Sequence, residues 1–229
     1  MKLAIMQPYF FPYIGYWQLI NAVDTFVIFD DVNFIKKGYI NRNSILASGS
    51  PHLITLELIG ASQNKLINEI AVGDNGKKLL TTIRHSYSKA PYFNIVFPII
   101  EDILNQDERN LAKYLGYSLR KVSDYLEIRV NFIFSSHIEK NNSLKGQDKI
   151  LDICEKLNTT RYVNSIGGQG IYNEKFFNIK GVSLNFLEME FLKYEQFESK
   201  FIHNLSIIDL MMFNSKEDIE RILNNYYLI

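Results

Sequence analysis

The sequence predicts an α/β fold with a mainly parallel, Rossmann-like sheet, flanking helices, a helical insertion in the middle and a helical C-terminus. Two observations support this prediction. Short apolar runs typical of buried strands alternate along the chain with segments whose apolar residues recur at helical spacing. The chain also begins with a strand, a short helix and a second strand, which form a compact βαβ unit whose strands should be parallel.

The elements follow from this patterning. The predicted strands are short apolar or alternating runs, and they cover residues 2–6, 25–29, 52–59, 129–134, 161–163 and 183–187. The predicted helices cover residues 14–23, 76–88, 92–104, 109–126, 147–157, 172–178, 205–213 and 216–226. Pro91 separates the second helix from the third because proline disfavours helix at the preceding residue. Residues 33–50 are polar and rich in turn formers.

The composition is that of a globular protein with a core of its own. Apolar residues make up 47% of the 229 residues and charged residues 22%. We expect a single α/β domain over residues 1–229, with a helical subdomain at about residues 76–127, because repeats, linkers and low-complexity tracts are absent from the sequence.

Charge and cysteine content restrict the partners and the compartment. Lys+Arg and Asp+Glu are equal at 25 each, so no overall field favours nucleic acid, and we expect none as a partner. The uncharged stretch from Leu3 to Val23 contains Pro8 and Pro12, which would break a membrane-spanning helix, so we expect no transmembrane segment. The single cysteine, Cys154, falls in a helical pattern and is interpreted as buried filler. We therefore expect a cytoplasmic protein.

An aromatic loop follows the first strand. Gln7, Tyr9, Tyr13, Gly15 and Tyr16 lie between that strand and the first helix, where ligands bind in parallel α/β folds. Glycine at a helix start lets a ligand approach free N–H groups that favour phosphate. The arrangement is similar to the adenylyl-transfer superfamily, with tyrosines where that superfamily has histidines. The alternative is an aromatic cluster that fills the first strand–helix corner.

Polar residues follow the second strand. Asp30 and Asp31 end it, and one of them could hold Mg²⁺ or a sugar hydroxyl; the alternative is a solvated turn, or an ion pair with the basic residues just downstream. Side-chain alternation directs the two carboxylates to opposite faces. A second polar cluster, which could bind phosphate or carboxylate, contains Lys36, Asn41, Arg42 and Asn43; the alternative is a solvated hairpin.

Two further segments supply candidate residues. His85 lies near a helix end and is a candidate general base, the alternative being a charge that stabilises the helix C-terminus. None of the four histidines is spaced for a helical metal site, and we expect no bound zinc. A glycine-rich loop at residues 164–170 allows close approach of a ligand, or simply a tight turn. Its candidate substrate-binding residues, with the tyrosine that follows, are Ser165, Gly167, Gly168 and Tyr172.

Near the C-terminus, Ser206 is interpreted as a helix cap and Asp209 as an inward-facing carboxylate.

Several of these segments together resemble the WbqC-like family, from Met1 to about Leu223. The runs are MQPYFFPYIGYWQLINAVDTFVIFDDVNFIKKGYINRN, SKAPYF, the glycine-rich loop with Tyr172, and LSIIDLMMF. Tyr39 stands where the family pattern leads us to expect tryptophan, which keeps an aromatic wall. The family's block maps onto Gln7, Pro8, Tyr9, Tyr13, Gly15, Tyr16, Asp30, Asp31, Lys36, Asn41, Arg42 and Asn43.

The resemblance implies a function in bacterial surface-polysaccharide (O-antigen) biosynthesis, because family members occur with such proteins and some carry the label glycine or aminoacyl transferase. We therefore expect a transferase that attaches an acyl or aminoacyl group to an amino sugar on a nucleotide. Asp31 or His85 would act as base, and Arg42 would stabilise developing charge. ATP with Mg²⁺ is required only if the acid is activated in place; otherwise an acyl carrier supplies the group. The alternative is a non-catalytic sugar-nucleotide binding or assembly protein.

Overall fold

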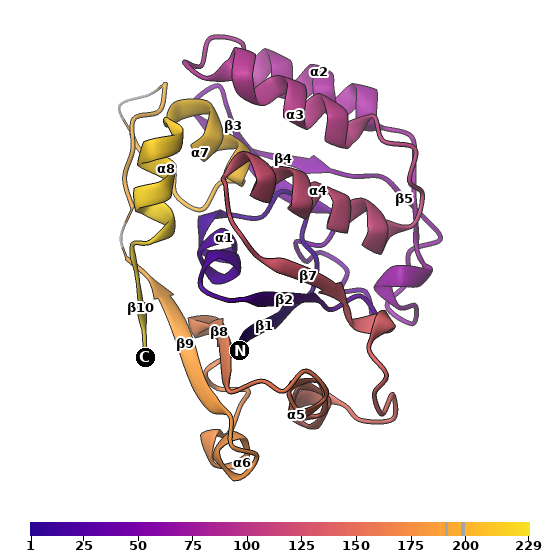
Figure 1. Ribbon diagram of the computed structural model, residues 1–229. Coiled ribbons are helices and arrows are strands. Elements are labelled where there is room, and N and C mark those ends of the chain that lie inside the picture. Colours follow the sequence, from indigo (N-terminus) through magenta and orange to yellow (C-terminus); the bar gives the residue numbers. More distant parts are fainter. Residues whose placement is uncertain (191, 198–199) are drawn as a thin grey trace.

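A six-stranded sheet lies at the centre of the computed structural model, which describes residues 1–190, 192–197 and 200–229 (Figure 1). The strand order is β10-β9-β8-β1-β2-β7. All strands are parallel except the edge strand β10, which is antiparallel to β9. The strands are β1 (Lys2–Met6), β2 (Thr25–Ile28), β7 (Asn131–Phe134), β8 (Arg161–Ser165), β9 (Ser183–Met189) and β10 (Tyr226–Leu228). The mainly parallel sheet and the parallel N-terminal βαβ unit are therefore confirmed.

The strand order reverses at β1. From β1 the chain proceeds outward to β2 and β7, then returns to the other side of β1 and proceeds outward through β8 and β9. The point between β1 and β8 is a topological switch point, and in open α/β sheets ligands bind at the carboxyl ends of the strands that meet there.

Helices cover both faces of the sheet. Alternate residues of β2 divide between two cores: Phe26 and Ile28 join the larger core, whereas Val27 joins the smaller one. The helices that contribute to the larger core are α1 (Ile14–Asn21), α2 (Gly76–Tyr87), α3 (Phe93–Leu104), α4 (Leu111–Tyr125), α7 (Ile207–Phe213) and α8 (Lys216–Leu223). The smaller core lies under α5 (Gly146–Lys156) and α6 (Glu174–Ile179). None of the helices described is long and apolar enough to cross a membrane.

The segment predicted to be turn-rich contains a strand. β3 (Arg42–Ala47) pairs with β4 (Ser50–Thr55) in an antiparallel hairpin, and β5 (Leu58–Ile59) pairs with β6 (Ala71–Val72). The strand predicted over residues 52–59 is therefore divided into β4 and β5. β3 was missed because its polar residues conceal a two-residue apolar core, Ile45 and Leu46, that is buried by tertiary packing.

The C-terminus also differs from the prediction. The helix expected over residues 216–226 ends at Leu223, and the chain then forms β10. The buried amide of Gln18 in α1 donates to the carbonyl oxygens of Ile222 and Asn225, at 2.8 and 3.0 Å. This contact satisfies carbonyl groups at the helix end, and the chain continues as the edge strand beside β9.

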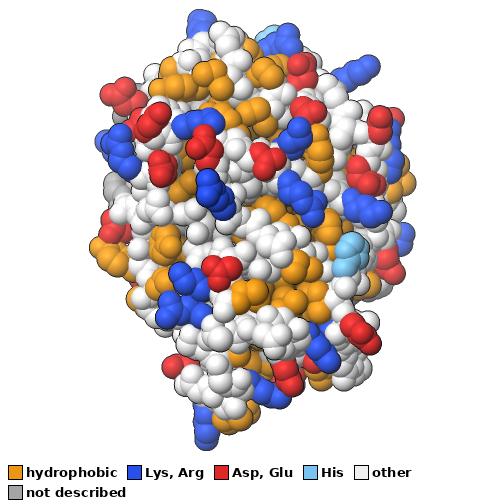
Figure 2. Space-filling view, in the orientation of Figure 1, with side chains coloured by type: hydrophobic (Ala, Val, Ile, Leu, Met, Phe, Trp, Pro, Cys, Tyr) orange, Lys and Arg blue, Asp and Glu red, His pale blue; other side chains and the backbone are white. Residues whose placement is uncertain are grey.

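Acidic and basic side chains are interspersed on the face of the molecule that Figure 2 shows. This mixture agrees with the equal numbers of acidic and basic residues in the sequence.

Candidate functional site

The loop over residues 7–13, called the opening loop below, leaves β1 at the switch point. The pairing of β1 with β2 continues to the last residue of β1, where Met6 is opposite Ile28. The pairing of β1 with β8 covers only Lys2 and Leu3. β1 and β8 therefore cease to pair before their carboxyl ends, and the opening loop lies at that end of the sheet.

The opening loop is held by three elements. Phe11 has a φ of 43°, in the left-handed region that is uncommon for residues other than glycine. Its carbonyl oxygen accepts hydrogen bonds from Asn43 Nδ2 and Ser206 Oγ, both at 2.8 Å. The next carbonyl, that of Pro12, accepts from Trp17 Nε1 at 3.0 Å. A non-glycine residue in this conformation persists only where its surroundings over-determine it, and such residues cluster at functional sites.

A cavity of about 270 Å³ lies over this loop. Its walls are Tyr9, Pro12, Tyr13, Tyr39, Asn43 and Asn204, and we call it the tyrosine pocket. The Tyr9 and Tyr39 rings have their centroids 6.1 Å apart, and 59% of Tyr39 is exposed. The volume is just below the usual range of about 300–1,000 Å³ for small-molecule sites, so the pocket suits one sugar ring or one base.

The pocket tyrosines are neutral hydrogen-bond donors. Burial, with smaller effects from neighbouring tyrosines, raises the pKa of Tyr9 and of Tyr13. Their hydroxyl groups therefore keep their protons at physiological pH. Tyr16 is different, since it is buried and its hydroxyl donates to the Gln7 carbonyl oxygen at 2.8 Å. Tyr16 supports the opening loop from below and does not line the pocket.

Gly15 makes room for the pocket wall. A Cβ atom at this position would lie 2.6 Å from the Tyr13 ring, which is closer than van der Waals contact allows. The Tyr13 ring thus packs against the backbone at the start of α1. The space that the sequence suggested for a phosphate at Gly15 is occupied by this ring.

The polar cluster over residues 36–43 organises the pocket. The Arg42 guanidinium donates to the carbonyl oxygens of Gly38 and Lys37, and the first of these bonds is 3.1 Å long. In turn, the Tyr39 carbonyl oxygen accepts from the Phe10 backbone N–H at 3.0 Å. Arg42 therefore holds the turn that carries Tyr39 against the opening loop.

The two asparagines beside Arg42 bond to the backbone, whereas the nearby Lys36 faces solvent. Asn41 Nδ2 donates to the Leu56 carbonyl oxygen at 2.8 Å, whereas Asn43 donates to the opening loop and lines the pocket. Lys36 is exposed.

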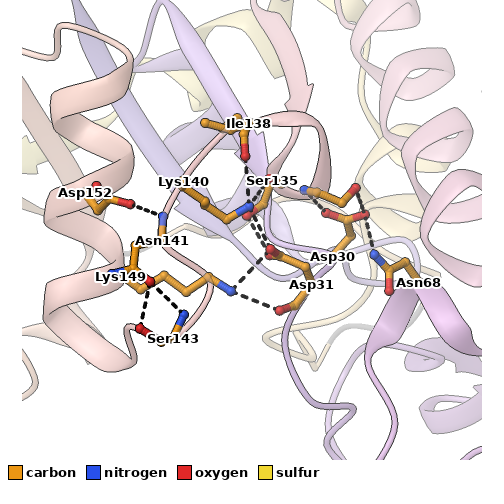
Figure 3. A network of polar contacts seen from close by, with 11 residues as sticks. Asp30, Asp31, Asn68, Ser135, Ile138, Lys140, Asn141, Ser143, Lys149 and Asp152 are labelled. Carbon is orange, nitrogen blue, oxygen red and sulfur yellow. Dashed lines mark hydrogen bonds and ion pairs between the residues drawn. The ribbon is translucent and has the colours of Figure 1, made fainter.

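Asp30 is buried in a network of neutral donors beyond the end of β2 (Figure 3). Its carboxylate accepts from the Ser136 backbone N–H at 2.9 Å, from Ser136 Oγ at 2.6 Å and from Asn68 Nδ2 at 3.2 Å. These bonds join the end of β2 to the turn after β7.

Asp31 points to different partners, two of which are lysines (Figure 3). Its carboxylate lies 2.7 Å from Lys140 Nζ and 3.2 Å from Lys149 Nζ, and it accepts from Ser135 Oγ at 2.6 Å. Burial alone raises the pKa of the Asp31 carboxyl. Hydrogen bonds from Lys140 and Ser135 and the charges of both lysines outweigh this effect and hold the pKa below its usual value of 3.8.

The two carboxylates do not fit a Mg²⁺ site in this arrangement. Mg²⁺ binds through carboxylate oxygens and retains several waters. The oxygens of Asp30 are taken by Ser136 and Asn68, and two ammonium groups adjoin Asp31. Of the two interpretations made from the sequence, the ion pair describes Asp31, and its partners come from farther along the chain than expected.

His85 lies apart from these contacts. It is exposed in the last turn of α2, where its neighbour Arg84 pairs with Glu101 at 3.7 Å. Among the described residues, no hydrogen bond or ion pair joins any two of His85, Asp31 and Arg42. The three residues proposed for catalysis thus have separate surroundings.

The glycine-rich loop is packed on the α6 side of the sheet. A Cβ on Gly168 would lie 2.6 Å from Asn164 Nδ2, so this glycine permits close packing, whereas Gly167 is open. The Tyr172 ring packs edge-on against Tyr162, with centroids 5.7 Å apart. Ser165 ends β8 at the switch point. None of these residues lines the tyrosine pocket.

Sequence reasoning missed some contributors. Lys140 and Lys149 gave no signal because they are far from Asp31 in sequence, and Asn204 is a single polar residue in an irregular segment. The expectations for the C-terminal segment are confirmed: Ser206 caps α7 and Asp209 is buried. Asp209 accepts from Tyr87, Tyr194 and Gln196, at 2.7–2.8 Å.

Comparison with known proteins assigns the family. The family model for the WbqC-like protein family matches residues 7–221, so the chain belongs to the WbqC-like family. It is 26% identical over 215 residues to the uncharacterized protein Rv1507c of Mycobacterium tuberculosis, and the match covers 92% of each chain. No solved structure matches the chain.

Proposed function

We propose that the tyrosine pocket binds the amino-sugar ring of a nucleotide-linked sugar, and that the protein acts in bacterial surface-polysaccharide biosynthesis. The observation that carries the proposal is the pocket itself, in which three tyrosines line one cavity over the loop that follows β1. Tyrosine rings give apolar surface for the sugar face, and their hydroxyls give hydrogen bonds for its oxygens and nitrogen.

The geometry favours binding over catalysis within the pocket. Among the residues that the structure describes, its lining is neutral and contains no carboxylate, histidine or lysine that could accept a proton near pH 7. This lining makes a non-catalytic sugar-nucleotide binding protein the first candidate function. The same proposal includes ligand binding at the carboxyl ends of the parallel strands, as in Rossmann-like folds, and the strand order supports it.

Transfer of an acyl or aminoacyl group to the sugar amine is the second candidate. The raised pKa values of Tyr9 and Tyr13 favour it, because protonated hydroxyls can donate to a carbonyl oxygen that gains negative charge during attack by the amine. The base would have to come from outside the pocket lining, from a residue such as His85 or Asp31. The activated acyl group would be supplied by a carrier. The proposal also assigns the protein to the cytoplasm, in keeping with its one buried thiol, Cys154.

The test compares two tyrosines of equal exposure. Tyr39 and Tyr227 are each 59% exposed, but only Tyr39 lines the pocket. Replacing Tyr39 by alanine should weaken binding of UDP- or dTDP-linked amino sugars severalfold, because the sugar face loses the apolar surface of the Tyr39 ring. Tyr227→Ala should bind as the wild type. Isothermal titration calorimetry measures both.

A second variant alters the same wall without removing a tyrosine. Gly15→Ala should displace the Tyr13 ring and weaken binding severalfold, while thermal stability is kept because alanine favours the helix. Gly167→Ala, whose added methyl has its nearest neighbour at 4.0 Å, is the control. Equal affinity of the wild type, Tyr39→Ala and Gly15→Ala, or no binding of any amino-sugar nucleotide to the wild type, would contradict the proposal. Incubation with acyl donors followed by mass spectrometry separates the two candidates, since only a transferase increases the mass of the sugar.

A further inference from the structure

A second, smaller cavity adjoins the tyrosine pocket. Its volume is about 100 Å³, and it lies between the end of β9, the start of α1 and α7. Most of its wall is apolar, formed by Ile14, Met189, Leu192, Phe201, Leu205 and Leu210, and the described lining also contains Glu190 and His203. Tyr194 adds a ring whose hydroxyl donates to Asp209 at 2.7 Å, so this polar atom is already bonded. We call this space the apolar cavity.

One residue connects the two spaces. Asn204 lines both the tyrosine pocket and the apolar cavity. Its φ of 57° is left-handed, a conformation that asparagine tolerates better than most residues. Its side-chain amide makes no hydrogen bond to other described residues. The Asn204 amide has two donor hydrogens and an acceptor oxygen, and it lies at the wall that the two spaces share.

The dimensions limit what can fill the apolar cavity. An apolar cavity of about 150 Å³ in another protein holds benzene, which has six carbons. In proportion, the apolar cavity accommodates about four carbon atoms. A sugar ring would not fit in a volume of about 100 Å³.

We propose that the apolar cavity binds the short acyl chain of an N-acylated amino sugar whose ring lies in the tyrosine pocket, with Asn204 bonded to the connecting amide. This inference rests on the proposed function of the tyrosine pocket and names its ligand more closely. The order of chemistry in the ligand, from hydroxylated ring through amide to short hydrocarbon, follows the order of the protein surfaces. Such a ligand is equally the product of an acyl transfer or the cargo of a binding protein.

The experiment measures affinity against chain length. The probes are UDP- and dTDP-linked amino sugars that carry a free amine or an acetyl, propanoyl, butanoyl or hexanoyl group. Wild-type affinity should rise about fourfold for each methylene that enters the cavity, up to about four carbons, because burying a methylene stabilises binding by that factor. It should fall for the hexanoyl probe, which exceeds the space.

Variants of Met189 change the cavity while leaving the tyrosine pocket intact. Met189 is partly buried at the end of β9 and does not line the tyrosine pocket. Met189→Ala should move the preferred chain toward hexanoyl. Met189→Trp should abolish the increase in affinity with acyl-chain length. Its affinity for the free-amine probe should equal that of the wild type. Phe201→Ala enlarges the cavity from another wall, and it should also shift the preferred chain toward hexanoyl. This variant tests the inference if either Met189 variant unfolds. Leu53→Ala, on the exposed side of β4, is the control.

The outcomes distinguish this inference from the proposed function. A flat dependence on chain length in the wild type, or the same dependence in the enlarged and the wild-type cavity, would overturn the acyl-chain inference. If in that case the free-amine probe still binds and Tyr39→Ala weakens it, the proposed function stands. If none of the probes binds the wild type, the proposed function fails and the inference fails with it.

Discussion

Asp31 illustrates how one side chain can connect distant parts of the chain. Lys140 lies in the segment after β7 and Lys149 lies in α5, and both contact the Asp31 carboxylate at the end of β2. The Asp31 side chain is 9% exposed and that of Lys140 is 1% exposed. Removal of one partner from a buried pair leaves an uncompensated charge, so this site should be sensitive to substitution.

At the residue scale, Asp31→Asn should lower the free energy of unfolding by about 3–5 kcal/mol at pH 7, because two lysines then lack their carboxylate. The folded-state pKa of Asp31 is lowered, so its contribution is complete well above 3.8 and is lost as the pH falls through the folded pKa. The difference between variant and wild type should therefore be the same at pH 7 and 6, and smaller at pH 3.5. Urea denaturation at the three pH values measures it.

An exposed ion pair provides the control for Asp31. Glu127 and Lys216 are 2.9 Å apart, but both side chains are largely solvated. Glu127→Gln should leave stability nearly unchanged, since solvation screens such pairs. If Asp31→Asn behaves like Glu127→Gln, then the Asp31 network does not stabilise the fold.

At the scale of elements, the opening loop is fixed jointly by β3 and α7. Asn43 in β3 and Ser206 at the start of α7 donate to the same Phe11 carbonyl oxygen. These two elements follow β1 at quite different points in the sequence, and they determine the conformation of the loop that carries Tyr9 and Tyr13. The pocket is therefore a product of tertiary packing around one short loop.

A double-mutant cycle tests this joint anchoring. Either Asn43→Ala or Ser206→Ala leaves one donor on the Phe11 carbonyl, whereas the double variant leaves a buried acceptor unsatisfied. The double variant should be less stable than the sum of the single effects by about 1–3 kcal/mol. Ser215 caps α8 as Ser206 caps α7, so Asn43→Ala combined with Ser215→Ala should be additive. Chemical denaturation of the wild type and the five variants gives the free energies of unfolding for both cycles, and additivity in both would contradict joint anchoring.

At the scale of the whole molecule, the helical segment from α2 to α4 is packed against the rest of the fold. Tyr87 in α2 donates to Asp209 in α7 at 2.8 Å and accepts from the Leu46 backbone N–H of β3. In α4, a Cβ on Gly116 would lie 2.6 Å from the Phe134 ring of β7. We propose that residues 1–229 unfold as one domain, with the segment at about 76–127 included.

The single tryptophan makes this proposal measurable. Trp17 is buried in α1, outside the helical segment, so its fluorescence reports on the sheet and its first helix. Circular dichroism reports largely on the helices, including α2 to α4. The thermal unfolding transitions followed by Trp17 fluorescence and by circular dichroism should coincide if the chain unfolds cooperatively. An earlier loss of circular dichroism would instead identify an independent helical subdomain.

Much of the fold could be predicted because its strands and helices carry local patterns. β1 and β2 are buried on both faces and appear as unbroken apolar runs, and α4 shows its leucines at helical spacing. β3 and β10 carry no such pattern. β3 pairs with the adjacent strand β4, but its polar residues conceal a short apolar core, whereas β10 is stabilised by β9, which lies far before it in sequence. In the candidate site, the opening loop was recognisable by its aromatic residues, whereas the position of Asn204 was not.

The sequence by itself determined the α/β class, the family resemblance and the place of the opening loop at the end of the first strand, since these depend on local patterns and on adjacency along the chain. Only the tertiary structure decided which residues meet. It joins Asp31 to two lysines, uses Arg42 to hold the turn that carries Tyr39, and fills the space beside Gly15 with Tyr13. Contacts between residues far apart in sequence depend on packing, which no local pattern specifies.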